Sequence, residues 1–168
     1  MTARWRFWLL TLGFDAFWAL AVGLRERTEW IALTIAVLAL LFSAGGSRWQ
    51  IISLMALGIA LDSLWLALDL FQFNGSHWLP LWMLALWLGF ACWWRLVMAT
   101  LNLPLLWLIP LGAVGGPLSY FIGEQLGAME LQHAPSLVYP LLACGWALYL
   151  PVARWILRAK DKSITADD

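Results

Sequence analysis

Charged side chains are scarce in this chain of 168 residues. Asp, Glu, Lys and Arg make up 12% of it, and ten basic residues balance ten acidic ones. A soluble domain usually carries about 25% charged residues, and a nucleic-acid-binding protein needs an excess of positive charge on one face. The low and balanced charge therefore excludes an ordinary soluble surface and predicts no nucleic-acid partner.

Residues that form disulfides and metal sites are equally rare, since the chain has only Cys92, Cys144, His77 and His133. Both cysteines lie in apolar runs without a CxxC spacing, which favours small packing residues over a disulfide framework or a metal site. The sequence has no HExxH motif, and no nucleophile–base pair stands out. We therefore expect no bound metal or cofactor, and an enzyme is the least favoured class of protein.

Apolar residues are abundant instead. They make up 63% of the chain, which includes 14 tryptophans, and the mean hydropathy is +0.79. A water-soluble fold of this size could not hide so much apolar surface, whereas a bilayer accommodates it. Tryptophan is enriched at the two interfaces of a bilayer. The composition therefore predicts a membrane protein with many interfacial indoles.

Six apolar segments approach or reach the length of about 20 residues that a spanning helix needs. They cover residues 7–24, 30–44, 51–71, 79–99, 104–129 and 137–157. None shows the polar stripe of a soluble amphipathic helix or the alternation of a barrel strand. The first is too long for the core of a signal peptide, so we expect it to stay uncleaved. The prediction is an all-α, polytopic transmembrane bundle of about six helices over residues 1–157, with a polar tail at residues 158–168.

The orientation of the bundle follows from Lys and Arg residues near the helix ends, which favour the cytoplasmic side. Six helices place both termini on one side. That side collects Arg4, Arg6, Arg48, Arg95, Arg154, Arg158, Lys160 and Lys162. The other side has only Arg25 and Arg27, so both termini and the tail are predicted to be cytoplasmic.

Four acidic residues fall within the predicted helices: Asp15, Asp62, Asp69 and Glu124. A charge at bilayer depth costs roughly 2.5–3.5 kcal/mol, so such residues usually face protein or a wet cavity. Asp62 and Asp69 are seven residues apart, which would place both on one helical face. One interpretation is a polar path for proton relay or headgroup binding, because adjacent carboxyl groups can share a proton. The alternative is that each is neutral, hydrogen-bonded to a neighbouring helix, or directed to the interface.

Arg95 lies in a predicted helix between Trp94 and a further apolar run. Such a side chain can extend to the cytoplasmic phosphates as an interfacial anchor. The functional alternative is a buried partner for a carboxylate or for a lipid headgroup.

The segment 104–129 combines small residues, prolines and one acid. Gly112, Gly116, Gly123 and Gly127 recur at spacings that form one stripe, and such stripes let helix backbones approach closely in lipid. Pro117 cannot donate a backbone hydrogen bond, which predicts a kink.

Helix-breaking residues are tolerated at membrane depth where they are buried in protein or line a cavity. The segment 104–129 is therefore predicted to be central in the bundle. It is interpreted either as a tightly packed, kinked helix or as a cavity wall that presents Tyr120 and Glu124.

Three stretches carry a resemblance to a known family. They are GIALDSLWLALDLFQF at residues 58–73, LPLWMLALWLGFA at residues 79–91 and GAVGGPLSYFIGEQLGA at residues 112–128. Together they resemble the bacterial family called domain of unknown function 2878, whose members are small inner-membrane proteins of similar length. The resemblance covers nearly the whole chain and implies a multi-pass protein of the bacterial inner membrane. The positions it singles out for testing are Asp62, Asp69, Gly116, Pro117, Tyr120 and Gly123.

The resemblance brings no established activity with it. It implies only an association, because genes of the family often lie near enzymes that modify fatty-acyl chains, such as cyclopropane fatty acid synthase. The leading hypothesis is an accessory factor for membrane lipid modification or envelope maintenance that binds membrane lipids or a lipid-modifying enzyme. The alternative is a small proton-coupled transporter or channel that titrates Asp15 and Asp62. The sequence indicates neither the ligand nor the oligomeric state.

Overall fold

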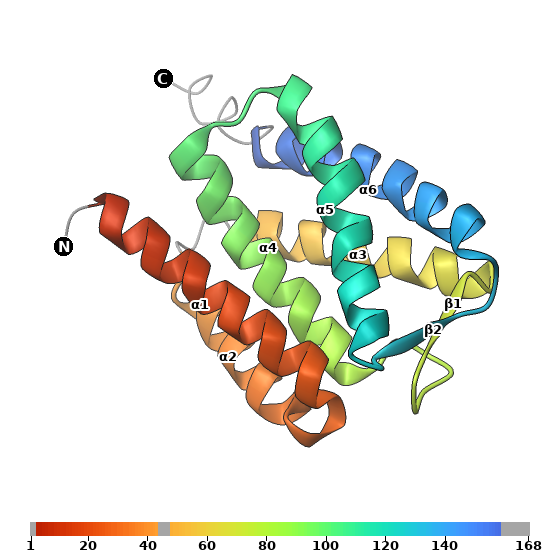
Figure 1. Ribbon diagram of the computed structural model, residues 1–168. Helices are drawn as coiled ribbons and strands as arrows, with labels where there is room; N and C mark the ends of the chain where they lie inside the picture. Colours follow the sequence, from red (N-terminus) through yellow and green to blue (C-terminus); the bar gives the residue numbers. More distant parts are fainter. Residues whose placement is uncertain (1–2, 44–47, 159–168) are drawn as a thin grey trace.

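The computed structural model describes residues 3–43 and 48–158. In these residues the chain forms six α-helices, one short 3-10 helix and two short strands (Figure 1). The elements are α1 (Ala3–Leu24), η1 (Arg25–Arg27), α2 (Glu29–Leu41), α3 (Arg48–Ala67), β1 (Phe71–Phe73), α4 (Leu81–Leu101), α5 (Leu105–Gln125), β2 (Met129–Leu131) and α6 (Pro135–Arg158). The six predicted helices are confirmed. Apart from Arg158, the predicted tail lies outside the described residues.

Five helices, α1, α3, α4, α5 and α6, are long and apolar enough to cross a membrane. Helix α2 has 13 residues, which at about 1.5 Å per residue gives roughly 20 Å. The hydrocarbon core of a bilayer is thicker, at about 30 Å. The chain is thus a multi-pass helical protein, and the number of crossings and the side of its termini stay predictions.

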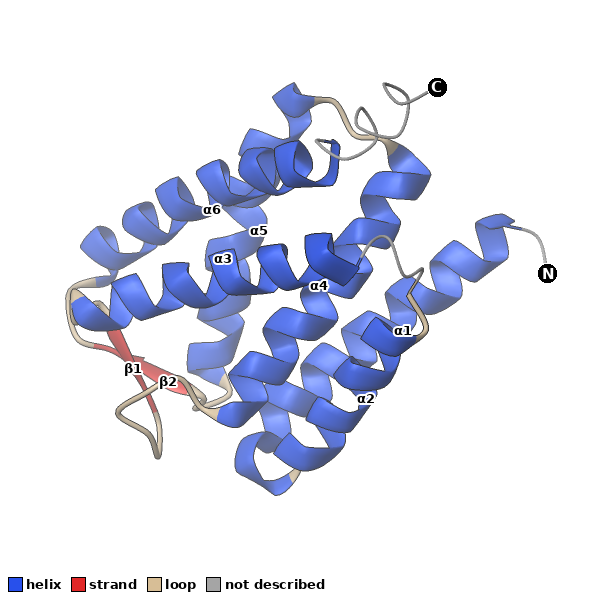
Figure 2. Cartoon of the chain, turned by 180° about the vertical axis from the view of Figure 1, so that it is seen from behind, coloured by secondary structure: helices blue, strands red, loops and turns tan. Residues whose placement is uncertain are grey.

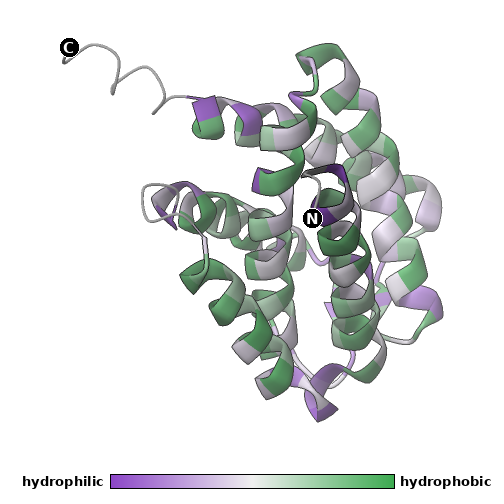
Figure 3. Cartoon of the chain, turned by 90° about the vertical axis from the view of Figure 1, so that its left-hand side faces the viewer, coloured by the Kyte–Doolittle hydropathy of each residue, from purple (hydrophilic) through white to green (hydrophobic). Residues whose placement is uncertain are grey.

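The outer surfaces of the helices are apolar. Figure 3 shows hydrophobic residues along the bundle and hydrophilic ones gathered toward its two ends. Leu106 of α5 and Leu148 of α6 are 77% and 69% exposed. Helices that faced water would carry a polar stripe on this side, so lipid is the solvent that suits the exterior.

Helix α4 is the centre of the fold. It packs against α1, α2 and α3, and ten of its residues are buried. Helix α5, in contrast, packs chiefly against α6. Its buried residues form a single stripe of Leu108, Gly112, Gly116, Tyr120 and Gly123. The prediction that segment 104–129 is central was therefore wrong, because only one stripe of it needs protein neighbours and the rest faces outward.

The sequence predicted helices through residues 71 and 129. Both predictions were wrong by four residues, since α3 ends at Ala67 and α5 ends at Gln125. Asp69 and Gly127 follow these helices with positive φ angles of 55° and 70°. This left-handed conformation terminates helices and is easy for glycine. After Gly127 the amide of Ala128 returns a hydrogen bond to the Gly123 carbonyl, which closes the end of α5.

The residues that follow the ends of α3 and α5 form the antiparallel strands β1 and β2. Phe71 lies opposite Leu131 and Phe73 opposite Met129. Figure 2 shows this ladder at the end of the bundle where α3 and α5 finish. It joins the α3–α4 connection to the α5–α6 connection, so the two halves of the chain are tied at this end by backbone hydrogen bonds.

The tryptophans divide between the exterior and the interior. Seven are exposed, as expected for interfacial or lipid-facing indoles. Five are buried: Trp65, Trp82, Trp87, Trp94 and Trp146. The expectation of interfacial indoles is therefore wrong for these five, which build an aromatic interior, and stays a prediction for the exposed ones.

Candidate functional site

Asp62 is the one charged side chain that is buried in the described part of the chain, with 0% exposure. It lies in α3, and its carboxylate accepts a hydrogen bond from Trp87 Nε1 at 2.6 Å and another from the Tyr120 hydroxyl. These donors come from α4 and α5, so one carboxylate connects three helices. Burying a carboxylate is costly unless its oxygens are hydrogen-bonded, and here each oxygen has a donor.

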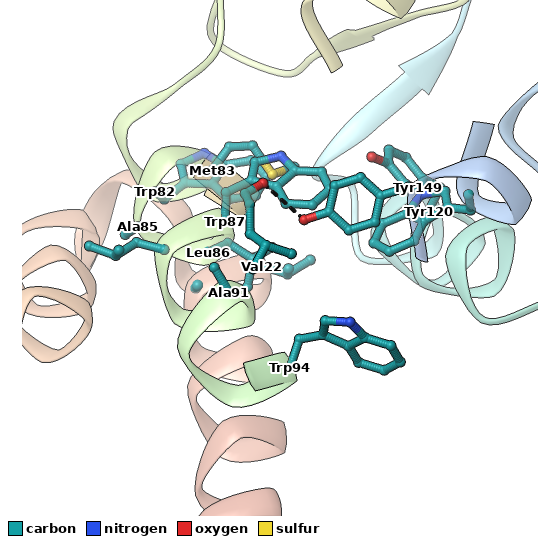
Figure 4. Packing of buried hydrophobic residues seen from close by; sticks show 14 of the residues in the cluster. Val22, Trp82, Met83, Ala85, Leu86, Trp87, Ala91, Trp94, Tyr120 and Tyr149 are labelled. Carbon is teal, nitrogen blue, oxygen red and sulfur yellow. Dashed lines mark hydrogen bonds between the residues drawn. The ribbon is translucent and has the colours of Figure 1, made fainter. Parts of the chain in front are cut away.

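Aromatic rings surround this carboxylate. Trp87 stacks on Trp146 with ring centroids 5.4 Å apart and planes at 16°, and Tyr149 lies 5.3 Å from Trp87. Trp65 meets the edge of the Tyr120 ring at 5.6 Å. Figure 4 shows Trp87 and Tyr120 side by side in this cluster. The rings keep water and acyl chains away from the carboxylate.

A cavity of about 260 Å³ lies beside the cluster. Trp87 and Tyr120 line it, whereas Asp62 lies behind them and does not. Its walls come from α1, α4, α5, α6 and the strands, and they include Phe14, Trp18, Met83, Leu86, Phe90 and Leu150. The lining hydroxyl of Ser119 is already bonded to the Gly116 carbonyl at 2.6 Å. The cavity is therefore apolar and suits a hydrocarbon ligand.

Helices α1 and α5 each contribute several residues to the wall of the cavity. At one end the two helices meet, where Val22 faces Gly123 and the Arg25 side chain donates a hydrogen bond to the Gly127 carbonyl. Nearer the start of α5, Leu111 lines the cavity and yet is exposed. The wall of the cavity therefore reaches the apolar exterior of the bundle at Leu111.

Three tryptophans that line this cavity have a buried indole N–H group without a hydrogen-bond partner among the described residues. They are Trp82, Trp94 and Trp146. Trp146 neighbours the Tyr120 hydroxyl, so Trp82 and Trp94 are the freer donors. An unpaired buried donor costs about 1–3 kcal/mol. A ligand that brought an acceptor oxygen against one of these indoles would satisfy its N–H group.

The glycines of α5 take different roles. Gly112 and Gly116 press against Trp146, so that an added Cβ at either position would overlap with this residue. Gly115 lines the cavity and has open space around it. Close approach of helix backbones is the role predicted for the stripe, and α6 is the partner helix at Gly112 and Gly116. Gly127 lies in the turn after α5 rather than on the predicted stripe, and Pro117 lies inside the continuous helix.

The predicted acidic path is not formed. Asp15 lies on the exposed side of α1, and Asp69 lies beyond the end of α3, where it is exposed and accepts a hydrogen bond from Gln72 at 3.2 Å. Glu124 accepts a hydrogen bond from the Tyr139 hydroxyl at 2.6 Å, which ties α5 to α6. Only Asp62 turns inward, because it alone has buried donors on neighbouring helices.

The remaining predicted residues lie elsewhere. Arg95 is partly buried and lines a second, polar cavity. Tyr120 lines the apolar cavity, as the cavity-wall interpretation proposed, but Glu124 does not. Both histidines are exposed. Over residues 3–43 and 48–158, no group of three or more His, Cys, Asp or Glu side chains gathers that could hold a metal.

Sequence reasoning missed the aromatic side chains of α4 and α6. Met83, Trp87, Phe90 and Trp94 recur at intervals of four, three and four residues, which is the spacing of one helical face. That periodicity was the available signal. It was obscured because every side of the helix is apolar and tryptophan was assigned to the interface.

The fold and the site together define a class: a multi-pass helical membrane protein with an apolar side cavity beside a buried carboxylate. Residues 7–152 match the family described as Protein of unknown function (DUF2878). The chain belongs to this family, as the resemblance had indicated. No curated protein and no solved structure shows a significant match to the chain.

Proposed function

We propose that this protein binds a membrane lipid by holding part of an acyl chain in the cavity between α1 and α5. The observation that carries the proposal is an apolar cavity whose wall includes exposed residues of α5, such as Leu111 and Gly115. Ligand sites are typically concave, mostly apolar and furnished with a few polar groups. Here Trp82 and Trp94 are the polar members of the wall, since their indole N–H groups have no partner among residues 3–43 and 48–158.

The size of the cavity narrows the ligand class. Its volume of about 260 Å³ lies just below the range of about 300–1,000 Å³ that small-molecule sites occupy. It therefore suits a segment of one acyl chain rather than a whole two-chain lipid. Acceptor oxygens of a carboxyl or ester group would pair with the indole donors, which favours an oxygen-bearing acyl lipid over a plain hydrocarbon.

The biological setting of the proposal rests on the family resemblance. We place the protein in the bacterial inner membrane with both termini in the cytoplasm, where it presents its lipid to a modifying enzyme or supports envelope maintenance. It would perform no chemistry itself. A proton-coupled transporter is less well supported, because Asp62 does not line the cavity and Asp15 lies on the exterior.

The test is native mass spectrometry of the full-length protein, released from membranes in mild detergent, with the retained lipids counted and identified. Gly115→Leu adds an apolar side chain to the α5 wall of the cavity, at a position where an added Cβ meets open space. Gly13→Leu is the matched control, since Gly13 on α1 also has open space but lies outside the cavity.

We expect the wild type and Gly13→Leu to retain an acyl lipid and Gly115→Leu to lose most of it at an unchanged unfolding temperature. Equal retention by all three forms would contradict the proposed site. Retention of no lipid by the wild type, together with no uptake of added fatty acid, would contradict lipid binding itself.

A further inference from the structure

A second cavity, of about 450 Å³, lies at the end of the bundle where α3 begins and α4 and α6 finish. Three arginines line it: Arg95 on α4, and Arg154 and Arg158 on α6. The amide side chains of Gln50 and Asn102 complete its polar wall. This is the end that the distribution of basic residues predicts to be cytoplasmic.

The arginines of this cavity have no acidic partner in its lining, which contains neither Asp nor Glu among the described residues. Arg158 donates a hydrogen bond to the Asn102 side chain at 2.8 Å, which is a neutral partner. One guanidinium nitrogen of Arg154, Nη1, is buried and finds no acceptor in the described part of the chain. Three positive charges around one concave space attract an anion.

Helix ends alone do not account for this arrangement. The final carbonyl groups of α4 and α6 carry partial negative charge, and basic side chains are common beside such ends. However, Gln50 already donates a hydrogen bond to the Leu157 carbonyl at 2.8 Å, and Arg154 Nη1 has no acceptor among the residues that the structure describes. Three full charges also exceed the half charge at each helix end.

We infer that this cavity binds a phosphate group through Arg95, Arg154 and Arg158. Arginine is suited to phosphate because its planar fork donates two parallel hydrogen bonds. Basic pockets between transmembrane helices on the cytoplasmic side accept anionic headgroups. The phosphate belongs either to the headgroup of an anionic lipid or to a free phosphate ion. The inference does not depend on the acyl-chain site, which lies at another place in the fold.

The experiment uses the full-length protein in nanodiscs of phosphatidylcholine with a minor fraction of phosphatidylglycerol. Native mass spectrometry measures the enrichment of phosphatidylglycerol among retained lipids, with and without added inorganic phosphate. Arg154→Gln removes the charge and the fork, Arg154→Lys keeps the charge only, and Arg27→Gln removes an exposed charge at the opposite end.

We expect phosphatidylglycerol enrichment in the wild type, a loss of about tenfold in Arg154→Gln and a smaller loss in Arg154→Lys. Enrichment that inorganic phosphate does not reduce assigns the site to a lipid headgroup. Displacement of phosphatidylglycerol by inorganic phosphate assigns it to the phosphate group in either form.

Two results would overturn the inference. One is a wild-type protein that does not enrich phosphatidylglycerol and whose retained lipids do not change when inorganic phosphate is added. The other is an equal loss in Arg27→Gln, because that would reflect net charge rather than a built site. Acyl-lipid retention by Arg154→Gln is measured in parallel. Unchanged retention shows that the variant is folded and that the acyl-chain site is independent of the arginine cavity.

Discussion

The Tyr120 hydroxyl of α5 donates a hydrogen bond to the carboxylate of Asp62 on α3, across 58 positions of sequence. Trp87 of α4 donates to the other carboxylate oxygen. The carboxylate therefore fixes two aromatic side chains that form part of the cavity wall. Asp62 acts as a positioning residue: it sets the shape of the cavity without touching what the cavity contains.

Substitution of Asp62 separates this structural role from a role in proton transfer. In Asp62→Asn, the amide oxygen can still accept from Trp87, and the amide N–H can donate to the Tyr120 oxygen, since a hydroxyl accepts as well as donates. Asp62→Leu leaves both partners buried without an acceptor or donor, at about 1–3 kcal/mol each. We expect an unfolding temperature near that of the wild type for Asp62→Asn and a clearly lower one for Asp62→Leu.

Intrinsic tryptophan fluorescence during heating in detergent gives these unfolding temperatures. The control is Ser63→Leu, at the neighbouring exposed position of α3, which should leave the unfolding temperature unchanged. If Asp62→Asn were as unstable as Asp62→Leu, the negative charge itself would be required. The transporter hypothesis would then regain support.

The indole N–H groups of the cavity tryptophans lead to a separate prediction about which ligand the protein prefers. Trp94→Phe removes an N–H group that has no partner in the described residues and leaves an aromatic ring at the position. We expect the preference for a fatty acid over an alkane of equal length to fall about 2- to 10-fold, which is the range for one neutral hydrogen bond.

Competitive retention of the fatty acid and the alkane, measured by mass spectrometry, provides this ratio. A purely structural effect of the substitution would lower the retention of both ligands together and leave the ratio unchanged. Trp107→Phe, at an exposed position of α5 outside the cavity, is the matched control. An unchanged ratio in Trp94→Phe would show that this indole does not contact the ligand's oxygen.

Neighbouring glycines of α5 should respond in opposite ways to the same substitution. A Cβ at Gly116 would overlap with the Trp146 indole, whereas a Cβ at Gly115 meets open space. Overpacking of this kind costs about 1–3 kcal/mol, while alanine favours a helix over glycine by about 0.8–1.0 kcal/mol. Thermal unfolding should therefore show a destabilised Gly116→Ala and a Gly115→Ala at least as stable as the wild type. Equal stability of the two variants would place the α5–α6 contact elsewhere.

The helices could be predicted because long hydrophobic runs are visible in the sequence without any knowledge of how the helices pack. Their ends were harder. Asp69 and Gly127 stop α3 and α5 through local backbone conformation, and the apolar residues that follow them look like further helix. Phe71 and Phe73 are apolar because they pack in the interior as a strand, which composition alone does not distinguish from a helical turn.

The site was predictable only in part. A lone carboxylate in the middle of an apolar helix needs hydrogen-bond donors. Tyr120 lies in the sequence beside the small residues that indicate tight packing. The sequence could not show that Asp15 would face outward, because every side of α1 is apolar and one aspartate gives no direction. The arginine cavity was also hidden: Arg95 and Arg154 are 59 positions apart, and only the packing of α4 and α6 on α3 brings them to one space.

Helix α2 has 13 residues, so its length is less than the thickness of the bilayer core. We expect α2 to cross nevertheless, because it packs along α4 and a bilayer can thin locally around a short helix at a modest cost. Single cysteines at Arg27, Ser43 and His77, placed in a Cys92→Ser, Cys144→Ser background, report the side on which each position lies.

A membrane-impermeant maleimide applied to intact cells should label the cysteines at positions 27 and 77. It should label position 43 only after the membrane is permeabilised. In the structure α1 and α3 finish at the same end of the bundle, where the Arg25 side chain contacts the turn after α5, so positions 27 and 77 should be labelled together. Labelling of positions 27 and 43 but not of position 77 in intact cells would mean that α2 enters and leaves on one side. The chain would then cross five times, and its two termini would lie on opposite sides of the membrane.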